Sequence, residues 1–375
     1  MIPKRIEETL KLGQSIWLDN IQRKDIVSGE LNRLITELGI RGETSNPAIF
    51  EKAISTSTDY QQEMQSLRNE GKNAQEIYDI VTVEDVTMAT REFRSVFDAS
   101  QNGDGMVSLE VSPNLAYDMA GTIADARRIY KQVGTPNVMI KIPGTAPCIH
   151  AVEECLYEGI PVNITLLFSC AAYEAVAWAY VHAMERRLDE KKPIDCVPSV
   201  ASFFISRMDG PADVLLDEGI AQASESQASR LRALKGQLGI ANARLAYQKH
   251  LKIFSSPRFL RLAQNGACIQ RPLWASTSTK NPAFPDVYYM DALIGANTVN
   301  TTPLETILAF SDHGTVANTL SDEYLQHSMR VVEEFAAVGI RLSDISSAVL
   351  QDGVTKFKDA YDKLIGYIER VSLAV

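Results

Sequence analysis

Short runs of β-branched and apolar residues alternate with longer stretches of helical periodicity along the chain. We predict eight strands from these runs, at residues 16–19, 41–45, 106–111, 138–142, 161–166, 196–201, 271–275 and 298–300. Helical patterns separate most of them, for example at residues 22–38, 114–132, 148–158 and 171–190. Such alternation is typical of parallel strands joined by right-handed helical crossovers.

Eight strand–helix units favour an α/β fold, namely a closed (β/α)8 TIM barrel with extra helices. An open doubly wound sheet stays as the alternative, although no G-x-G-x-x-G opens an early helix. We expect a single barrel domain over residues 1–375, without a Pro/Gly/Ser-rich linker. Residues 209–254 predict an outer helical pair, and residues 320–375 predict two or more amphipathic helices.

Lys141 lies in the middle of the apolar run 138–143, where side chains should point into a partly buried interior. A full ammonium is expensive to bury, so such a lysine forms an ion pair or becomes neutral. A neutral amine in a cleft is a nucleophile for carbonyl carbons and gives a Schiff base. The simpler alternative is a strand-end lysine that reaches solvent.

Polar residues stand at the ends of the predicted strands, where a barrel carries its chemistry. They are Asp19, Asn46, Glu110, Asn163, Thr165, Ser199, Ser202, Ser276, Ser278 and Lys280, with Phe204 and Arg207 just beyond the sixth strand. Asp, Asn, Ser and Thr are also common helix caps and turn residues, which is the alternative for most of them. Glu110 and Lys141 lie within strands, so capping does not explain them, and both would face one interior if the barrel closes.

Composition narrows the function classes. The net charge of −10 over 375 residues argues against a nucleic-acid or membrane-surface partner, which needs a basic stripe. The five cysteines follow no metal spacing and predict reduced thiols. The first residues are charged where a secretion signal needs an apolar region. Residues 164–184 are mostly apolar but contain Glu174 and His182, so we interpret them as a buried strand and a core-facing helix.

Six local motifs, in order, resemble transaldolase. They are ETSNPAIF (43–50), VSLEVSP (107–113), VMIKIPGT (138–145), VNITLLFS (162–169), SVASFFISRMD (199–209) and LWASTSTKNP (273–282). The resemblance runs from about residue 16 to residue 314. RPLWAS (271–276) and DHG (312–314) resemble the long branch of plants and many bacteria, within the class I Schiff-base aldolases.

The resemblance implies transfer of a dihydroxyacetone unit between sugar phosphates, without metal or other cofactor. Lys141 matches the Schiff-base lysine. Asp19 would take a proton from the donor hydroxyl and return it to the acceptor aldehyde. Glu110 would exchange protons with a water that Thr165 holds. General acid–base help of this kind is worth roughly 10²–10⁴-fold in rate.

The remaining matched positions imply contacts with the substrate. Asn46 and Asn163 would hold hydroxyls and the intermediate, whereas Ser202 and Phe204 would shape the pocket around the dihydroxyacetone end. The phosphate would lie on three further residues. These are Arg207, Ser276 and Lys280. Some relatives carry a second arginine at position 278, where this chain has a serine.

Two departures from the commoner family pattern occur beside these motifs. Position 43 is Glu, where an apolar residue or Thr is frequent, and Ala146-Pro147-Cys148 replaces a Glu-Gly-type pair. The long branch shares both changes, and both leave the Lys141 assignment intact.

Three rival functions are compatible with a lysine-bearing barrel to different degrees. One is a related lysine aldolase that releases free dihydroxyacetone, and another is a catalytically silent scaffold or metabolite sensor. A metal-dependent hydrolase would need clustered histidines at strand ends, and the five histidines fall mainly on helical or loop stretches. We expect a cytoplasmic monomer or homodimer, with a processed plastid form left open.

Overall fold

Eight parallel strands form the centre of the molecule in the computed structural model, which describes residues 2–195 and 197–373. Each strand pairs with the next one along the chain, and the last pairs with the first, so the sheet closes. The strands are β1 (Gln14–Asp19), β2 (Gly42–Thr44), β3 (Met106–Glu110), β4 (Val138–Pro143), β5 (Val162–Leu167), β6 (Ser199–Phe204), β7 (Arg271–Ala275) and β8 (Thr298–Thr302). The predicted (β/α)8 barrel is confirmed, and the open-sheet alternative is wrong.

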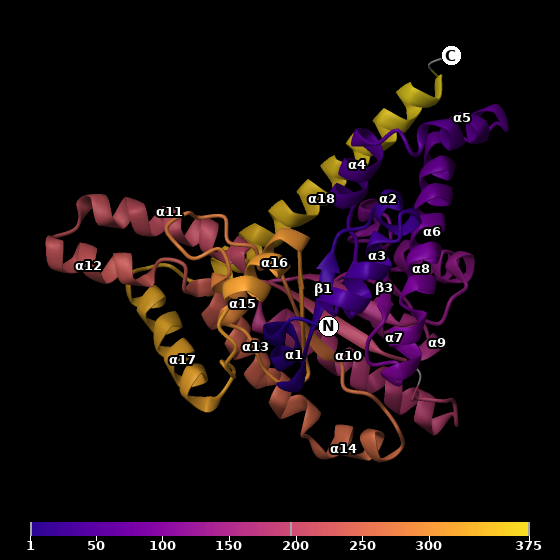
Figure 1. The fold of residues 1–375 in the computed structure, drawn as a ribbon. Coiled ribbons are helices and arrows are strands. Elements are labelled where there is room, and N and C mark those ends of the chain that lie inside the picture. Colours follow the sequence, from indigo (N-terminus) through magenta and orange to yellow (C-terminus); the bar gives the residue numbers. More distant parts are fainter. Residues whose placement is uncertain (1, 196, 374–375) are drawn as a thin grey trace.

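Helices surround the barrel and extend beyond it (Figure 1). They are α1 (Lys4–Lys11), α2 (Arg23–Val27), α3 (Glu30–Arg33), α4 (Pro47–Thr56), α5 (Gln61–Asn69), α6 (Ala74–Glu92), α7 (Arg94–Ala99), α8 (Met119–Val133), α9 (Cys148–Glu158), α10 (Cys170–Asp189), α11 (Ser206–Gln222), α12 (Glu225–Leu234), α13 (Leu238–Phe254), α14 (Pro257–Gln264), α15 (Tyr288–Asp291), α16 (Leu304–His313), α17 (Asp322–Ala337) and α18 (Leu342–Leu373). The hairpin of α11 and α12 projects away from the barrel, with α17 beside it in this view.

Alternation along each strand separates the outer core from the barrel interior. In β4, Ile140 and Ile142 belong to the apolar cluster shared with the helices, whereas Met139 belongs to the second cluster, with Trp17. Gly42 is required beside Trp17, because a Cβ there would lie 2.6 Å from the indole ring. The interior thus has an apolar layer that includes Trp17 and Met139. Ser15, Asp104 and Arg271 are hydrogen-bonded to one another at its amino-terminal end, and other polar side chains lie toward the carboxyl ends of the strands.

The sixth strand begins later than the sequence pattern indicated. It spans Ser199–Phe204 rather than residues 196–201, so Ser202 and Phe204 lie within the strand instead of at its end or beyond it. Pro198 lacks an N–H for the ladder, and pairing starts only after it. Cys196 lies outside the described residues, and Cys148, Cys155 and Cys170 are free thiols.

The helix predicted at residues 22–38 is broken into three pieces. These are α2, α3 and a π-helical turn at Leu34–Leu38. The break falls at Gly29, which has a φ of 79° and therefore cannot continue a right-handed helix. The helix predicted at residues 114–132 likewise begins later, at Met119, after a 3₁₀ turn at Pro113–Leu115.

The insertion predicted as an outer helical pair consists of three helices, α11, α12 and α13. Only α11 and α12 form the projecting hairpin; α13 is largely buried against the barrel and α10. The prediction was wrong because a polar, Ala/Leu-rich segment is typical of an outer helix, whereas the small side chains of α13 let it pack closely against α10 and α17. The apolar stretch at 164–184 forms β5 and the buried face of α10, as predicted.

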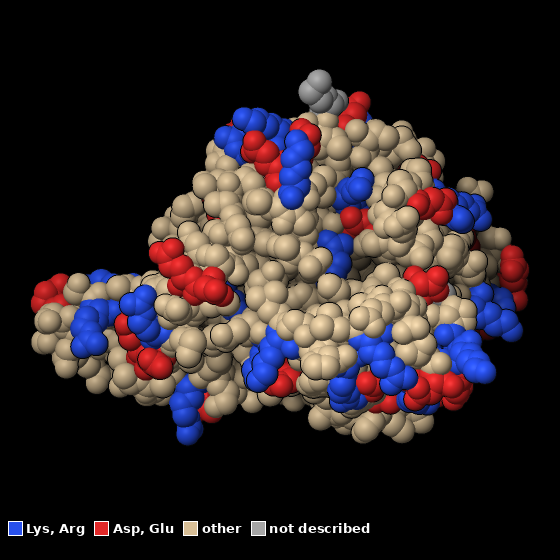
Figure 2. All heavy atoms as spheres, turned by 90° about the horizontal axis from the view of Figure 1, so that it is seen from below, with Lys and Arg blue, Asp and Glu red and all other residues tan. Residues whose placement is uncertain are grey.

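The surface carries charged side chains of both signs. On the face shown in Figure 2, basic and acidic side chains are interspersed. Among the described residues, no helix combines the length and the apolar character that crossing a bilayer requires.

The long C-terminal helix α18 runs diagonally along one side of the molecule (Figure 1) and contacts α4, α5, α6 and α11. Its Gly353 lies at the carboxyl end of the barrel, where a Cβ would be 3.1 Å from Leu166 and 3.6 Å from Arg207. Phe357 follows one turn later and is buried. The sequence predicted a packing helix here, but not that it would cover the end of the barrel.

Candidate active site

A cavity of about 180 Å³ opens at the carboxyl ends of the strands. It is lined by Asp19, Thr44, Asn46, Lys141, Ser202, Phe204, Arg207, Ala275, Ser276, Ser278, Lys280, Thr301 and Pro303. Eight of the eleven site residues predicted from the sequence are among them. The other three, Glu110, Asn163 and Thr165, are buried next to it on β3 and β5.

Lys141 is only 4% exposed, so the alternative of a strand-end lysine reaching solvent is wrong. Its Nζ donates to the carbonyl oxygen of Ser45 at 2.9 Å and lies 3.6 Å from a carboxylate oxygen of Glu110. Glu110 and Lys141 are register partners on β3 and β4, which places both side chains inside the barrel. Position in the strand thus forces the acid and the amine together.

Glu110 is a buried carboxyl group without conventional hydrogen bonds. Neither of its oxygens has a hydrogen-bond partner among the described residues. Burial raises the pKa of Glu110 to about 7, against the opposing attraction of Lys141. A carboxyl group with this pKa exchanges protons readily near neutral pH, which suits a general acid–base role.

Asp19 ends β1 and is held by a chain of hydroxyl groups. Thr44 Oγ1 donates to Asp19 Oδ1 at 2.7 Å, and lies 2.7 Å from Thr301 Oγ1. Burial raises the pKa of Asp19 above its ordinary value, while the Lys141 ammonium opposes the rise. The site thus contains two carboxyl groups in different surroundings, one hydrogen-bonded and one not.

Asn163 and Ser202 form a hydrogen-bonded pair on neighbouring strands. Ser202 Oγ donates to Asn163 Oδ1 at 2.6 Å, and Asn163 Nδ2 donates to Ser108 Oγ at 3.0 Å. Thr165 is buried, and its hydroxyl has no hydrogen-bond partner among the described residues. Its hydroxyl therefore retains the capacity to bind a water or a substrate group.

Asn46 caps a helix and also lies at the cavity wall. Its Oδ1 accepts from the backbone N–H of Ile49 at 3.0 Å, which caps α4, and Pro47 occupies the first helical position. The residue also lines the cavity. The cap fixes the side chain, so its amide group is held at the cavity wall.

Arg207 lies in the first turn of α11, next to the cavity. Its Nη1 is buried without a partner, and it forms no ion pair among the described residues. The guanidinium lies between two rings, 5.1 Å from the centre of Phe204 and 5.7 Å from that of Phe357. Burial lowers the pKa of Arg207, although the acids around it, Asp352 first, oppose this. An unpaired guanidinium of this kind is suited to an anionic ligand.

The loop after β7 supplies further polar groups on the same side. Ser276 has a φ of 58°, an uncommon conformation for a non-glycine residue, and its Oγ lies 2.9 Å from Ser206 Oγ. Ser278 accepts from Thr306 at 3.3 Å. Lys280 lines the cavity with an otherwise exposed side chain, so the solvated-loop alternative for it remains.

Sequence reasoning missed several residues of this site. Thr44 and Thr301 position Asp19, and their signal was weak because threonines are common in strands. Phe357, whose ring centre is 5.8 Å from Lys141 Nζ, had no local signal at all. Helical spacing predicts only that such a side chain packs, not against what.

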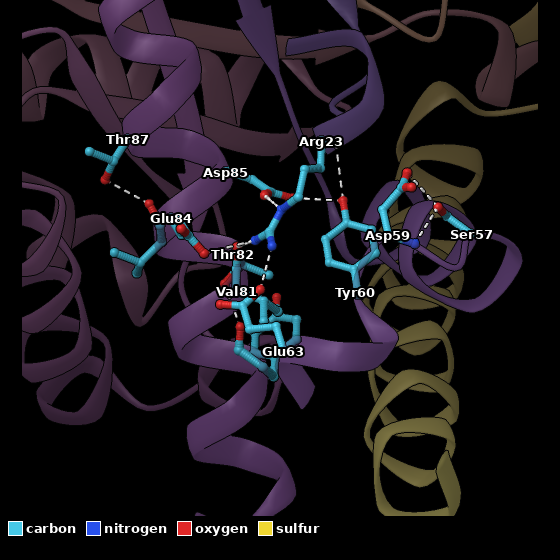
Figure 3. Close-up of polar contacts among 12 residues, drawn as sticks. Arg23, Ser57, Asp59, Tyr60, Glu63, Val81, Thr82, Glu84, Asp85 and Thr87 are labelled. Carbon is cyan, nitrogen blue, oxygen red and sulfur yellow. Dashed lines mark hydrogen bonds and ion pairs between the residues drawn. The ribbon is translucent and has the colours of Figure 1, made fainter. Parts of the chain in front are cut away.

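A network around Arg23 fixes the segment that follows Asp19 (Figure 3). Arg23 Nε donates to buried Asp85 at 2.6 Å, and the guanidinium also pairs with Glu63 and with Glu84. Tyr60 donates from its hydroxyl to Asp85 at 2.7 Å. The network joins the start of α2 to α5 and α6.

Metal ligation was not expected from the sequence. Within residues 2–195 and 197–373, histidine, cysteine and acidic side chains form no group of three or more suited to a metal ion.

Comparison with known proteins adds independent information. The model of the family described as Transaldolase/Fructose-6-phosphate aldolase matches residues 16–368. The chain is 43% identical to a transaldolase of Trichodesmium erythraeum (strain IMS101), over 98% of each protein. It is 43% identical to "Transaldolase 2" of Nostoc sp. (strain PCC 7120 / SAG 25.82 / UTEX 2576), over 96% of each protein. It is also 40% identical to a transaldolase of Frankia alni (strain DSM 45986 / CECT 9034 / ACN14a), over 97% of this chain and 96% of that protein. This chain therefore belongs to the transaldolase/fructose-6-phosphate aldolase family.

Proposed function

We propose that this protein is a transaldolase that works through a Schiff base on Lys141. It would move a dihydroxyacetone unit from sedoheptulose 7-phosphate or fructose 6-phosphate to glyceraldehyde 3-phosphate or erythrose 4-phosphate, in the non-oxidative pentose phosphate pathway. The observation that carries the proposal is the buried amine of Lys141 in the cavity, 3.6 Å from Glu110. Family membership supports the same reaction.

Schiff-base formation requires a neutral amine and the loss of one water. In our proposal Glu110 accepts a proton from Lys141, and the amine nitrogen attacks the ketone carbon of the donor. The resulting carbinolamine loses its hydroxyl group as water, with the proton supplied by Glu110. Thr165 holds this water through its unpartnered hydroxyl. The pKa of Glu110, raised by burial to about 7, suits both directions of proton transfer.

Cleavage then uses the second carboxyl group. Asp19 takes the proton from the donor hydroxyl, the adjacent carbon–carbon bond breaks, and its electron pair enters the iminium to give an enamine on Lys141. The aldose phosphate leaves. The enamine carbon next attacks the acceptor aldehyde, and Asp19 returns its proton to the new alkoxide. Hydrolysis of the Schiff base completes the transfer without metal.

Binding of the substrate is divided between the two ends of the cavity. We assign the hydroxyls of the three-carbon unit to Asn46, Asn163 and Ser202, with Phe204 as the wall. The phosphate lies against Arg207, Ser276 and Lys280. The unpaired guanidinium of Arg207 supports this assignment, because a phosphate would supply the charge partner that it lacks.

Trapping of the Schiff base tests the proposal. Borohydride reduction in the presence of fructose 6-phosphate, followed by peptide mapping, should place a three-carbon adduct on Lys141. Lys131→Gln is the matched control, because it removes an exposed lysine of α8 and should leave the adduct in place. Folded protein without any adduct on Lys141 would contradict the proposal.

The family includes aldolases as well as transaldolases, so the fate of the enamine must also be measured. With fructose 6-phosphate as donor and erythrose 4-phosphate as acceptor, we expect sedoheptulose 7-phosphate to form much faster than free dihydroxyacetone. Predominant release of free dihydroxyacetone would assign the chain to the aldolase reaction while leaving Lys141 in its role.

A further inference from the structure

A second arginine with unpaired donors lies outside the proposed active site. Arg244, on α13, is 6% exposed. Its Nη2 donates to the carbonyl of Ala292 at 2.9 Å, but its Nε is buried without a partner. Arg244 forms no ion pair within the described part of the chain. A buried cation without a counter-charge costs stability, so its retention calls for an explanation.

Arg187, another buried arginine of this chain, is an example of an arginine with a purely structural role. Arg187 is also 6% exposed and also lacks an ion pair among the described residues. It donates from Nε to the carbonyl of Pro193 and from Nη1 to that of Tyr157, both at 2.8 Å. Its donors are thus directed at backbone acceptors, and it lines none of the cavities described here. Arg244 differs because its Nε is buried without a partner and because it lines a cavity.

Arg244 lines a cavity of about 310 Å³ between α13, α15 and α17. The other lining residues are Gln237, Ile240, Ala241, Tyr288, Ala292, Tyr324, His327, Ser328 and Val331. No acidic side chain is among them, and none of them lines the proposed active site. The guanidinium lies 4.7 Å from the centre of the Tyr324 ring. The site thus joins one cation to walls made mainly of aliphatic and aromatic side chains.

The charge and the walls together indicate the kind of ligand. Burial lowers the pKa of Arg244 to about 10, so the guanidinium stays charged near neutral pH. One guanidinium neutralises one negative charge, and its planar fork matches a carboxylate. A phosphate dianion would keep an unpaired charge between apolar walls, which is unfavourable. An apolar or aromatic body would instead replace water against Ile240, Val331 and the tyrosine rings.

We propose that the cavity between α13, α15 and α17 binds a small organic acid, whose carboxylate lies on Arg244 and whose apolar or aromatic body lies against Tyr288 and Tyr324. The site is separate from the barrel end, and the proposal does not depend on the reaction assigned to Lys141. A cavity of this size is at the lower end of those that hold small molecules in proteins.

Benzoate and benzamide test the proposal, since they share their shape but differ in charge. Calorimetric titration of the full-length protein should show saturable binding of benzoate, roughly tenfold to hundredfold tighter than benzamide, as expected for a charged hydrogen bond. Arg244→Gln should abolish the difference between the two probes. Arg207→Gln is the matched control, because benzoate could also meet the arginine of the barrel end, and this variant should bind benzoate like the wild type.

Three results would overturn the proposal. They are equal affinity for benzoate and benzamide, loss of benzoate binding in Arg207→Gln rather than Arg244→Gln, and tighter binding of inorganic phosphate than of benzoate at this site. Should Arg244→Gln fail to fold, Tyr324→Ala replaces it. This side chain is 37% exposed, and its removal should weaken benzoate binding while leaving the fold intact.

Discussion

Replacing Arg207 with glutamine should reduce activity on phosphorylated substrates far more than on their unphosphorylated analogues. The guanidinium forms no ion pair among the described residues and has a buried, unpartnered Nη1, so a bound phosphate would be its charge partner. Each hydrogen bond to a charged group contributes about 1.5–3 kcal/mol. Loss of a bidentate pair should therefore lower kcat/KM by about 10²–10⁴-fold, at roughly 1.4 kcal/mol per factor of ten.

Stability should respond differently to the same change. The substitution loses the contacts with the rings of Phe204 and Phe357, worth about 0.5–2 kcal/mol, and the attraction of Asp352, but it also removes the cost of a desolvated cation. Urea unfolding of Arg207→Gln should thus stay close to the wild type. A large loss of stability would mean that the residue is structural.

Coupled detection of the released aldehyde, with fructose 6-phosphate and with fructose as donors, measures the effect. Arg91→Gln, at an exposed position on α6, is the matched control for the loss of one positive charge away from the cavity. It should change neither the rate with fructose 6-phosphate nor the rate with fructose. An equal loss on both donors in Arg207→Gln would refute the phosphate assignment, because fructose has no phosphate to lose contact with.

Other changes should separate the remaining roles. Lys141→Ala should abolish transfer and borohydride trapping with the circular dichroism spectrum unchanged; residual trapping elsewhere would contradict its role. Asp19→Asn should still trap the donor sugar but barely cleave it, so normal cleavage rates would reject its proton transfer. The wild-type kcat/KM should rise with pH through about 7, where Glu110 loses its proton, and Glu110→Gln should lack this rise and be slower by about 10²–10⁴-fold. Arg23→Met should destabilise the protein by about 3–5 kcal/mol in urea unfolding. This cost should shrink at acid pH, where buried Asp85 gains a proton, and a cost independent of pH would contradict the ion-pair explanation.

The position of α18 gives the site a feature that the barrel alone does not provide. Phe357 and Gly353 lie over Lys141, Arg207 and Leu166, so the C-terminal helix limits access of water to the carboxyl end of the barrel. Leu166 itself has a φ of 59° beside the register shift in β5. A bulky residue in this conformation is strained, and such strain is found where the surrounding structure fixes a functional site.

Much of the architecture was determined by local sequence. Alternating strand and helix periodicity predicted the eight-stranded barrel, and the position of Glu110 and Lys141 within strands of that barrel predicted that both face one interior. These predictions succeeded because they depend on neighbours in the chain. Local signals failed where a single residue overrides the pattern, as at Pro198 before β6 and at Gly29 between α2 and α3.

Only the tertiary structure decided the surroundings of the reactive groups. The ring of Phe357 reaches Lys141 from a helix more than 200 positions later in the chain, and Thr301 supports Thr44 from the opposite end of the barrel sequence. The unpaired donors of Arg244 also appear only once α13, α15 and α17 come together. Periodicity indicates which side of an element is buried, but the partner across that side depends on how the whole chain packs.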